Sequence, residues 1–161
     1  MFFINLKVTK NRALTGVTLF LVVILLVISI FSYSNSKQIN GEDLASRKAY
    51  LSSLGFSCEE ASEEKTLITI PTDFSKTYSD YNKRQLEAGF NLLDYKGYDA
   101  TVYTYLISNL ENLDGVYANL IVIDGKIIGG DISSIENGGF VLPLKTKREN
   151  EEILKSYVAT T

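Results

Sequence analysis

The sequence contains no histidine and no tryptophan, and its only cysteine is Cys58. One thiol cannot form an internal disulfide, and without histidine the chain cannot build a Cys/His zinc site. The serine- and cysteine-hydrolase triads are excluded too, because they need a histidine base. Chemistry based on carboxylates, lysine or tyrosine stays open. We therefore expect no metal, no cofactor and no complete catalytic set.

Acidic side chains are absent from the first 36 residues, which carry Lys7, Lys10 and Arg12. All 19 acidic and 13 of the 16 basic side chains lie in residues 37–161, so that part has a net charge of −6. A domain of this charge does not attract phosphate backbones, and we do not expect nucleic acid as a partner. Its length suits one compact domain.

A run without any charged residue extends from Ala13 to Phe31, and the next charge is Lys37. A helix of this length spans roughly 28 Å, close to the thickness of the hydrocarbon core. The basic residues before the run place the N-terminus in the cytoplasm. We therefore predict a cytoplasmic stub (1–12), a transmembrane helix (13–33) and a tether (34–41), with the remaining chain outside the cell.

A cleaved signal peptide is the main alternative to a retained anchor. It would begin with the same basic stub, and Ser32-Tyr33-Ser34 could serve as a cleavage site. The apolar core of a signal peptide is usually about 7–15 residues, which is shorter than this run. A buried helix of a globular domain is a third interpretation, but so uniformly apolar a helix is rare there. The anchor is favoured, and secretion after cleavage stays open.

The spacing of apolar and aromatic residues predicts two helices, Glu42–Leu54 and Phe74–Ala88, each followed by glycine and phenylalanine. Thr72 or Asp73 is expected to cap the second helix. Runs of β-branched and aromatic residues between turn residues predict five strands. These strands are Thr66–Ile70, Tyr98–Ser108, Val116–Ile123, Lys126–Ser133 and Phe140–Leu144.

Short turns join the later strands. Asp124-Gly125 is typical of a two-residue hairpin, and Asn137-Gly138-Gly139 predicts a second turn. Strands joined in this way form an antiparallel sheet, and we expect both helices to pack on one face of it, giving an α+β domain over 42–146. Pro143 indicates that the last strand is an edge strand. The charged tail, 147–161, is expected to be at most weakly helical.

Two groups of residues could carry chemistry. Gly129-Gly130-Asp131 matches the start of the Gly-Gly-Asp-Glu-Phe signature of cyclic-dinucleotide synthases, but Ile132 and Ser133 replace its last two residues. A bulge or a close approach of two backbones explains the glycines better. The four glutamates within 59–64 lack the ligand spacing of a calcium loop, and we interpret them as a solvated acidic loop.

A succession of short motifs resembles domain of unknown function 4830, a family found mainly in Gram-positive bacteria behind an N-terminal membrane or signal segment. The resemblance covers about residues 46–142. Family members often have Trp at Phe56 and Met-His-Gly at Val141-Leu142-Pro143. The motifs are Ile70-Pro71, Tyr78-x-x-Tyr81-Asn82-x-x-Gln85, Gly89-Phe90-x-Leu92, Tyr95-x-Gly97, Tyr103-Thr104-Tyr105, Ala118-Asn119-Leu120, Asp124-Gly125 and Ile128-Gly129-Gly130-Asp131.

The resemblance implies an extracytoplasmic domain but no activity. It singles out Tyr81, Asn82, Gln85 and Asp131 as a polar cluster and a candidate binding site. A structural role is equally open, because Asn82 and Gln85 could tie the helix to sheet edges by hydrogen bonds. We expect a membrane-tethered binding module with a protein or peptide partner outside the cell. An envelope enzyme using Asp, Glu, Lys or Tyr, and an accessory protein with a sensing role, are the alternatives.

Overall fold

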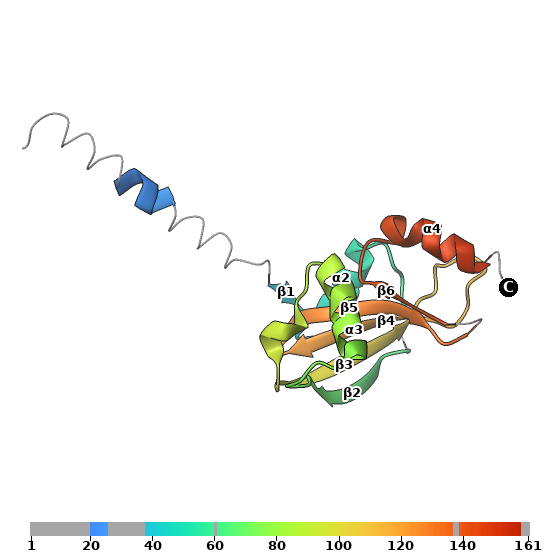
Figure 1. Cartoon of the computed structure of the whole chain (residues 1–161). Helices are drawn as coiled ribbons and strands as arrows, with labels where there is room; N and C mark the ends of the chain where they lie inside the picture. The colour runs from blue at the N-terminus through green and yellow to red at the C-terminus, as the bar shows by residue number, and fades with distance from the viewer. Residues whose placement is uncertain (1–19, 26–37, 60, 137–138, 159–161) are drawn as a thin grey trace, which may run out of the picture. The chain divides into compact units, whose positions relative to one another are not determined.

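The computed structural model describes residues 20–25, 38–59, 61–136 and 139–158, and these form parts of two compact units, Met1–Gln38 and Ile39–Thr161 (Figure 1). Within the first unit, residues 20–25 are helical. The rest of the expected transmembrane segment lies outside the described residues, as does the expected stub. In the described part of the chain, no helix combines the length and apolar character needed to cross a bilayer.

The second unit is built on a six-stranded antiparallel sheet with the order β1-β5-β4-β3-β2 (Figure 1). The outer edge of β5 has two partners, because β1 pairs with its first residues and β6 with its last ones. The strands are β1 (Ile39–Asn40), β2 (Glu64–Thr69), β3 (Asp99–Leu106), β4 (Val116–Ile123), β5 (Lys126–Ser134) and β6 (Phe140–Pro143).

The predicted strands are confirmed to within two residues at their ends. Asp124 and Gly125 have φ angles of 47° and 71°, and these left-handed values give the β4–β5 hairpin the turn that matches the twist of its strands. Pro143 lies in β6, whose only strand partner in the described sheet is β5. The two-residue strand β1 falls at the end of the expected tether, where Ile39 pairs with Ile127.

The two predicted helices are confirmed as α2 (Leu44–Ser53) and α3 (Lys76–Glu87). The prediction of Thr72 or Asp73 as the cap of α3 is wrong, because the Oγ of Ser75 accepts the hydrogen bond from the Tyr78 N–H at 3.2 Å. Phe74 therefore lies before the helix, where it packs its ring on Tyr78 with centroids 4.6 Å apart. A short 3₁₀ helix, η1 (Leu92–Tyr95), follows α3.

The helices do not share one face of the sheet, so that part of the predicted architecture is wrong. Alternate residues of β4 belong to two separate buried clusters, Leu120 and Val122 to one and Ile121 and Ile123 to the other. Successive strand residues point to opposite faces, so each face carries its own core. Leu51 of α2 packs in the first cluster, whereas the tyrosines of α3 pack against the second. Both faces of the central strands are apolar, and each therefore needs a helix over it.

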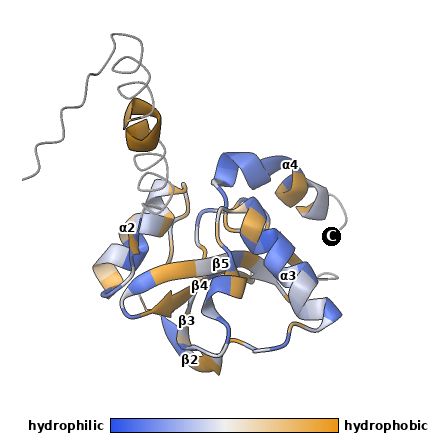
Figure 2. Cartoon of the chain, turned by 60° about the vertical axis from the view of Figure 1, so that its left-hand side comes forward, coloured by the Kyte–Doolittle hydropathy of each residue, from blue (hydrophilic) through white to orange (hydrophobic). Residues whose placement is uncertain are grey.

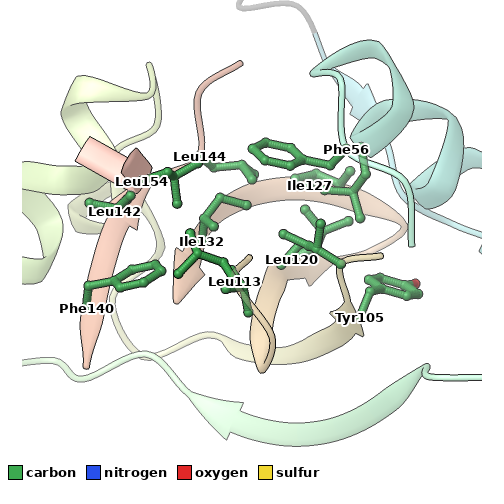
Figure 3. Packing of buried hydrophobic residues seen from close by; sticks show 14 of the residues in the cluster. Phe56, Tyr105, Leu113, Leu120, Ile127, Ile132, Phe140, Leu142, Leu144 and Leu154 are labelled. Atoms are coloured by element: carbon green, nitrogen blue, oxygen red, sulfur yellow. The ribbon is translucent and has the colours of Figure 1, made fainter. Parts of the chain in front are cut away.

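The first cluster is the larger one and is drawn in Figure 3. Leu142 and Leu154 lie at one end of it, and Phe56 and Tyr105 lie at the other. Phe56 follows the glycine that ends α2, and its N–H donates to the Leu51 carbonyl at 3.0 Å. This bond brings the phenylalanine back under the helix, as the Gly-Phe pattern indicates.

The charged tail forms a helix, α4 (Lys147–Val158), so the expectation of weak helicity is wrong. Figure 2 shows α4 as mainly hydrophilic with one hydrophobic stretch. Within that stretch Leu154 is 4% exposed and joins the larger cluster. Thr146 and Glu149 bond each other's backbone and side-chain atoms at the start of the helix, as in a capping box. The capping residues and the single buried leucine were visible in the sequence, but the density of charge obscured them.

Candidate functional site

The structure brings three of the four predicted site residues together at β5. Gln85 and Tyr81 lie one turn apart on α3 and both reach this strand, where they meet Gly130 and Asp131. Asn82 projects elsewhere and bonds the segment around η1. The aromatic and amide residues of α3 therefore hold the helix against the sheet at two successive strand positions.

Gln85 is fully buried and acts as a substitute for a strand partner. Its Nε2 donates to the Gly130 carbonyl at 2.9 Å, and its Oε1 accepts from the Gly130 N–H at 2.8 Å. Gly130 lies on the outer edge of β5 between the stretches that pair with β1 and with β6. An amide side chain presents the same donor and acceptor as a peptide group, so Gln85 satisfies the backbone in this gap.

The two adjacent glycines make this contact possible. A Cβ on Gly129 would lie 2.9 Å from the Gln85 Oε1 and 3.0 Å from the Leu92 Cδ2. A Cβ on Gly130 would collide with the Asn119 carbonyl oxygen and with the Leu144 side chain. The Gly-Gly pair is thus explained by the close approach of α3 and of β4 to β5, which is the interpretation that the sequence favoured over a nucleotide site.

Asp131 is 6% exposed and is held by neutral hydrogen-bond donors. The Tyr81 hydroxyl donates to its Oδ2 at 2.7 Å, and the Asn119 Nδ2 donates to its Oδ1 at 2.7 Å. Burial raises the pKa of Asp131, and the hydrogen bonds from Tyr81, Asn119 and Ser133 only partly oppose this. Burial and the neighbouring carboxylate also raise the pKa of the Tyr81 hydroxyl. The pKa of both groups is therefore raised, while the phenol donates its hydrogen bond to the carboxylate.

The network around Asp131 continues across the sheet on the same face as α3. Asn119 also donates to the Ser133 Oγ at 2.9 Å, and its Oδ1 accepts from the Thr104 hydroxyl at 2.7 Å. In this way Asn119 connects β3, β4 and β5. Asn119 was not predicted as a site residue. The Ala118-Asn119-Leu120 motif was the available signal, but only the strand register shows that Asn119 lies opposite Asp131.

Asn82 is 4% exposed and fixes the turn that leaves α3. Its Oδ1 accepts from the Leu92 N–H at 2.8 Å, and its Nδ2 donates to the Asn91 Oδ1 at 3.2 Å. These bonds place Leu92 in the smaller buried cluster. Among the described residues, no buried side-chain nitrogen or oxygen lacks a hydrogen-bond partner. The predicted polar residues are therefore engaged inside the domain.

A second polar site, which the sequence analysis missed, is centred on Arg47 of α2. Its side chain is 3% exposed and donates to the Tyr105 hydroxyl at 2.7 Å and to the Glu63 Oε2 at 2.8 Å. It also donates to the carbonyls of Gly41 and Glu42 at 2.8 and 3.1 Å. The guanidinium carbon lies 3.6 Å from the centre of the Tyr103 ring, a stacking contact that suits arginine.

Glu63 is the counter-charge of Arg47, and the interpretation of its loop as a uniformly solvated acidic stretch is wrong at this residue. The Tyr105 hydroxyl donates to its Oε2 at 2.5 Å. Burial disfavours the charge on Glu63, but the hydrogen bonds from Tyr105 and Arg47 outweigh it and lower the pKa of the carboxyl. In the described part of the chain, no group of three or more carboxylates, thiols or imidazoles is arranged to hold a metal ion. Glu63 therefore acts as the ion-pair partner of Arg47.

A groove of about 440 Å³ lies between the loop before β4 and helix α4. Its apolar lining includes Leu110 and Leu113 of the loop and Leu154 of the helix. Charged residues surround this lining, and they are partly tied to the domain, since the Lys147 ammonium donates to the Asn109 carbonyl at 2.6 Å. The complete lining is Leu110, Glu111, Asn112, Leu113, Lys147, Glu151, Leu154, Lys155 and Val158.

The groove was not predicted from the sequence, because half of it comes from a tail expected to lack stable structure. The other half comes from the loop between β3 and β4, whose leucines carry no local signal of a partner. The chain matches no family model, no curated protein and no solved structure.

Proposed function

We propose that this chain is a membrane-tethered binding module, with residues 13–33 as the anchor and the α+β domain outside the cell. The apolar run and the basic residues before it support the anchor and its orientation. The groove beside α4 supports binding. The partner is a protein or peptide outside the cell that inserts apolar side chains between the loop and the helix.

The composition of the groove carries this proposal. Leu110, Leu113 and Leu154 offer an apolar floor, and a volume of about 440 Å³ is within the range of sites that bind small ligands or side chains. Lys155 and Glu151 form an ion pair of 2.6 Å at its side. Because the rim carries both signs of charge, it suits a peptide with mixed charges around its apolar residues better than a polyanion.

The polar networks support a scaffold role for the rest of the domain. The Asp131 and Arg47 networks lie on opposite faces of the sheet, and each joins one helix to the strands. A rigid sheet with helices fixed on both faces can hold a peripheral groove in a constant shape, which lowers the entropic cost of binding.

A photo-crosslinking residue at Leu110 tests this proposal in the full chain, in its native membrane. The same residue at Leu86, exposed on α3, is the matched control. We expect a discrete adduct from Leu110 that the 38–161 fragment displaces, and none from Leu86. Identical adducts from both positions, or an adduct that the fragment fails to displace, would contradict the proposal.

The anchor is tested separately. A C-terminal tag should be removed by protease added to intact cells, and the chain should stay in the membrane after alkaline extraction at its full mass. A shorter chain released into the medium would instead establish the cleaved, secreted form. Both forms carry the same groove, so if the chain is released, the crosslinking is carried out on the chain in the medium.

A further inference from the structure

One long edge of the described sheet is covered by other segments of the chain, whereas the other long edge is open. The edge at β5 is covered along most of its length, because β1 pairs with Ile127, Gln85 bonds Gly130, and β6 pairs with the stretch from Asp131 to Ser134. The other edge is β2, which ends the strand order and pairs on one side only in the described sheet. Leu67 at the middle of β2 is 84% exposed. An exposed apolar residue on an open edge favours pairing with another strand.

The backbone of β2 presents its free hydrogen-bonding groups at three positions. Ile70 donates to the Tyr98 carbonyl and accepts from the Gly97 N–H, so its peptide groups point toward β3. In an antiparallel pair, successive residues point alternately toward the partner and away from it. Lys65, Leu67 and Thr69 therefore direct their N–H and C=O groups away from β3. A new strand must bond these residues.

We propose that a second copy of this chain pairs with β2, antiparallel and across a two-fold axis at Leu67. A symmetric pair can be centred on an outward-pointing residue of β2 or on a residue between two of them, and only the axis at Leu67 sets the two exposed leucines opposite each other. An axis at Lys65 would set two ammonium groups opposite each other, which is unfavourable. An axis at Thr69 would set Leu67 opposite Pro71, which has no N–H to donate. The axis at Leu67 avoids both faults.

Charge complementarity supports the same register. With the axis at Leu67, Lys65 stands opposite Thr69 of the second copy. Thr69 is paired across to Asp99 of β3, and its hydroxyl donates to the exposed Asp99 carboxylate at 2.7 Å. Each Lys65 thus lies one strand from an acidic group of the other copy, and this occurs twice by symmetry. Leu67 packs against Leu67 between these pairs and loses its exposure to water.

Disulfide crosslinking tests both the pairing and its register in the full chain. Replacing Cys58 with Ser removes the only native thiol. In that background Leu67→Cys should form a covalent dimer under mild oxidation, because residues on the axis bring their Cα atoms within disulfide range. Leu86→Cys, at an exposed leucine on α3, should not. Chains carrying Lys65→Cys should crosslink to chains carrying Thr69→Cys but not to themselves.

A charge on the axis provides the second measurement. Leu67→Lys leaves the fold intact because the side chain is exposed, but it sets two ammonium groups face to face. By light scattering, the native chain and Leu86→Lys should have the mass of a dimer, and Leu67→Lys half of it. Equal crosslinking of Leu67→Cys and Leu86→Cys, or self-crosslinking of Lys65→Cys, would overturn the proposal. So would a monomeric native chain whose β2 crosslinks to a different protein, which would assign this edge to an extended peptide.

Discussion

Gln85 and Gly130 exchange two hydrogen bonds through one side-chain amide and one backbone peptide position. This arrangement closes the outer edge of β5 where no strand covers it. It also fixes the position of α3 along β5, because the Gln85 amide can form both hydrogen bonds with Gly130 at only one position of the helix along the strand. The contact therefore links the register of a helix to the register of a strand.

Replacing Gln85 with Glu tests this link. The carboxylate can still accept from the Gly130 N–H, but it cannot donate to the Gly130 carbonyl, and a charge is placed in a fully buried position. We expect a loss of about 3 kcal/mol in the free energy of unfolding at neutral pH. Urea unfolding of the 38–161 fragment measures it. The control is Glu87→Gln, at the exposed last residue of α3, which should change the free energy of unfolding by less than about 0.5 kcal/mol. Equal losses from the two substitutions would contradict the role of Gln85 in closing the edge of β5.

Replacing Arg47 should strongly lower the free energy of unfolding of the domain. Arg47→Met leaves half-buried Glu63 with only the exposed Lys65, 3.4 Å away, as a counter-charge, and it removes the side-chain donor to the Gly41 and Glu42 carbonyls. Breaking one side of a buried ion pair costs about 3–5 kcal/mol. Lys83→Met is the control, because its 2.6 Å pair with Asp80 is exposed and contributes little. Chemical denaturation of both variants compares the two sites.

The same network predicts an acid response. The folded-state pKa of Glu63 is lowered, so its contribution to stability is present above the ordinary pKa of a glutamate, 4.5, and is lost as the pH falls through the lowered value. Glu63→Gln should therefore destabilise the domain at neutral pH and lose this effect in acid. A stability difference between native and variant chains that is constant with pH would show that the charge of Glu63 has no role.

Asp131 should respond to pH in the opposite sense. Its folded-state pKa is raised, so its contribution is fully present below the ordinary value of 3.8 and is lost as the pH rises through the folded-state pKa. Asp131→Asn removes the titration, and the amide can still accept from Asn119 and donate to the Tyr81 oxygen. As the pH rises from the ordinary value of 3.8 through the raised folded-state pKa, the variant should gain stability relative to the native chain. Asp114→Asn in the exposed loop provides the control for a general charge effect.

The elements of the domain follow from local chemistry that is readable in the sequence. The Asp-Gly turn, the Gly-Phe helix ends and the β-branched runs each specify a conformation over a few residues, and the strands and helices appear where these signals stand. The face on which each helix packs is a tertiary property. Ile121 and Ile123 made β4 apolar on both sides, and this was the available signal that both faces need a helix.

The polar networks depend on contacts that are distant in sequence. Arg47 meets Tyr105, 58 positions later, and nothing local distinguishes it from the solvated charges of α2. Its place on the same helix face as Leu51, one turn away, was the only indication of burial. Tyr81 and Asp131 were identified together by a resemblance of motifs, whereas their hydrogen bond requires the register of β5 against α3.

Helix α4 provides a final test, because it decides whether the tail belongs to the folded domain. Leu154 is 4% exposed within the large cluster, whereas its neighbour Ile153 is 44% exposed on the same helix. Leu154→Ala should cost about 2–4 kcal/mol by removing buried methyl groups, and Ile153→Ala should cost less than about 1 kcal/mol. The Leu154 variant should also lose the crosslink from Leu110, because the groove loses one wall. If both variants unfold at the same urea concentration as the native fragment, α4 does not stabilise the domain and the groove has no fixed wall.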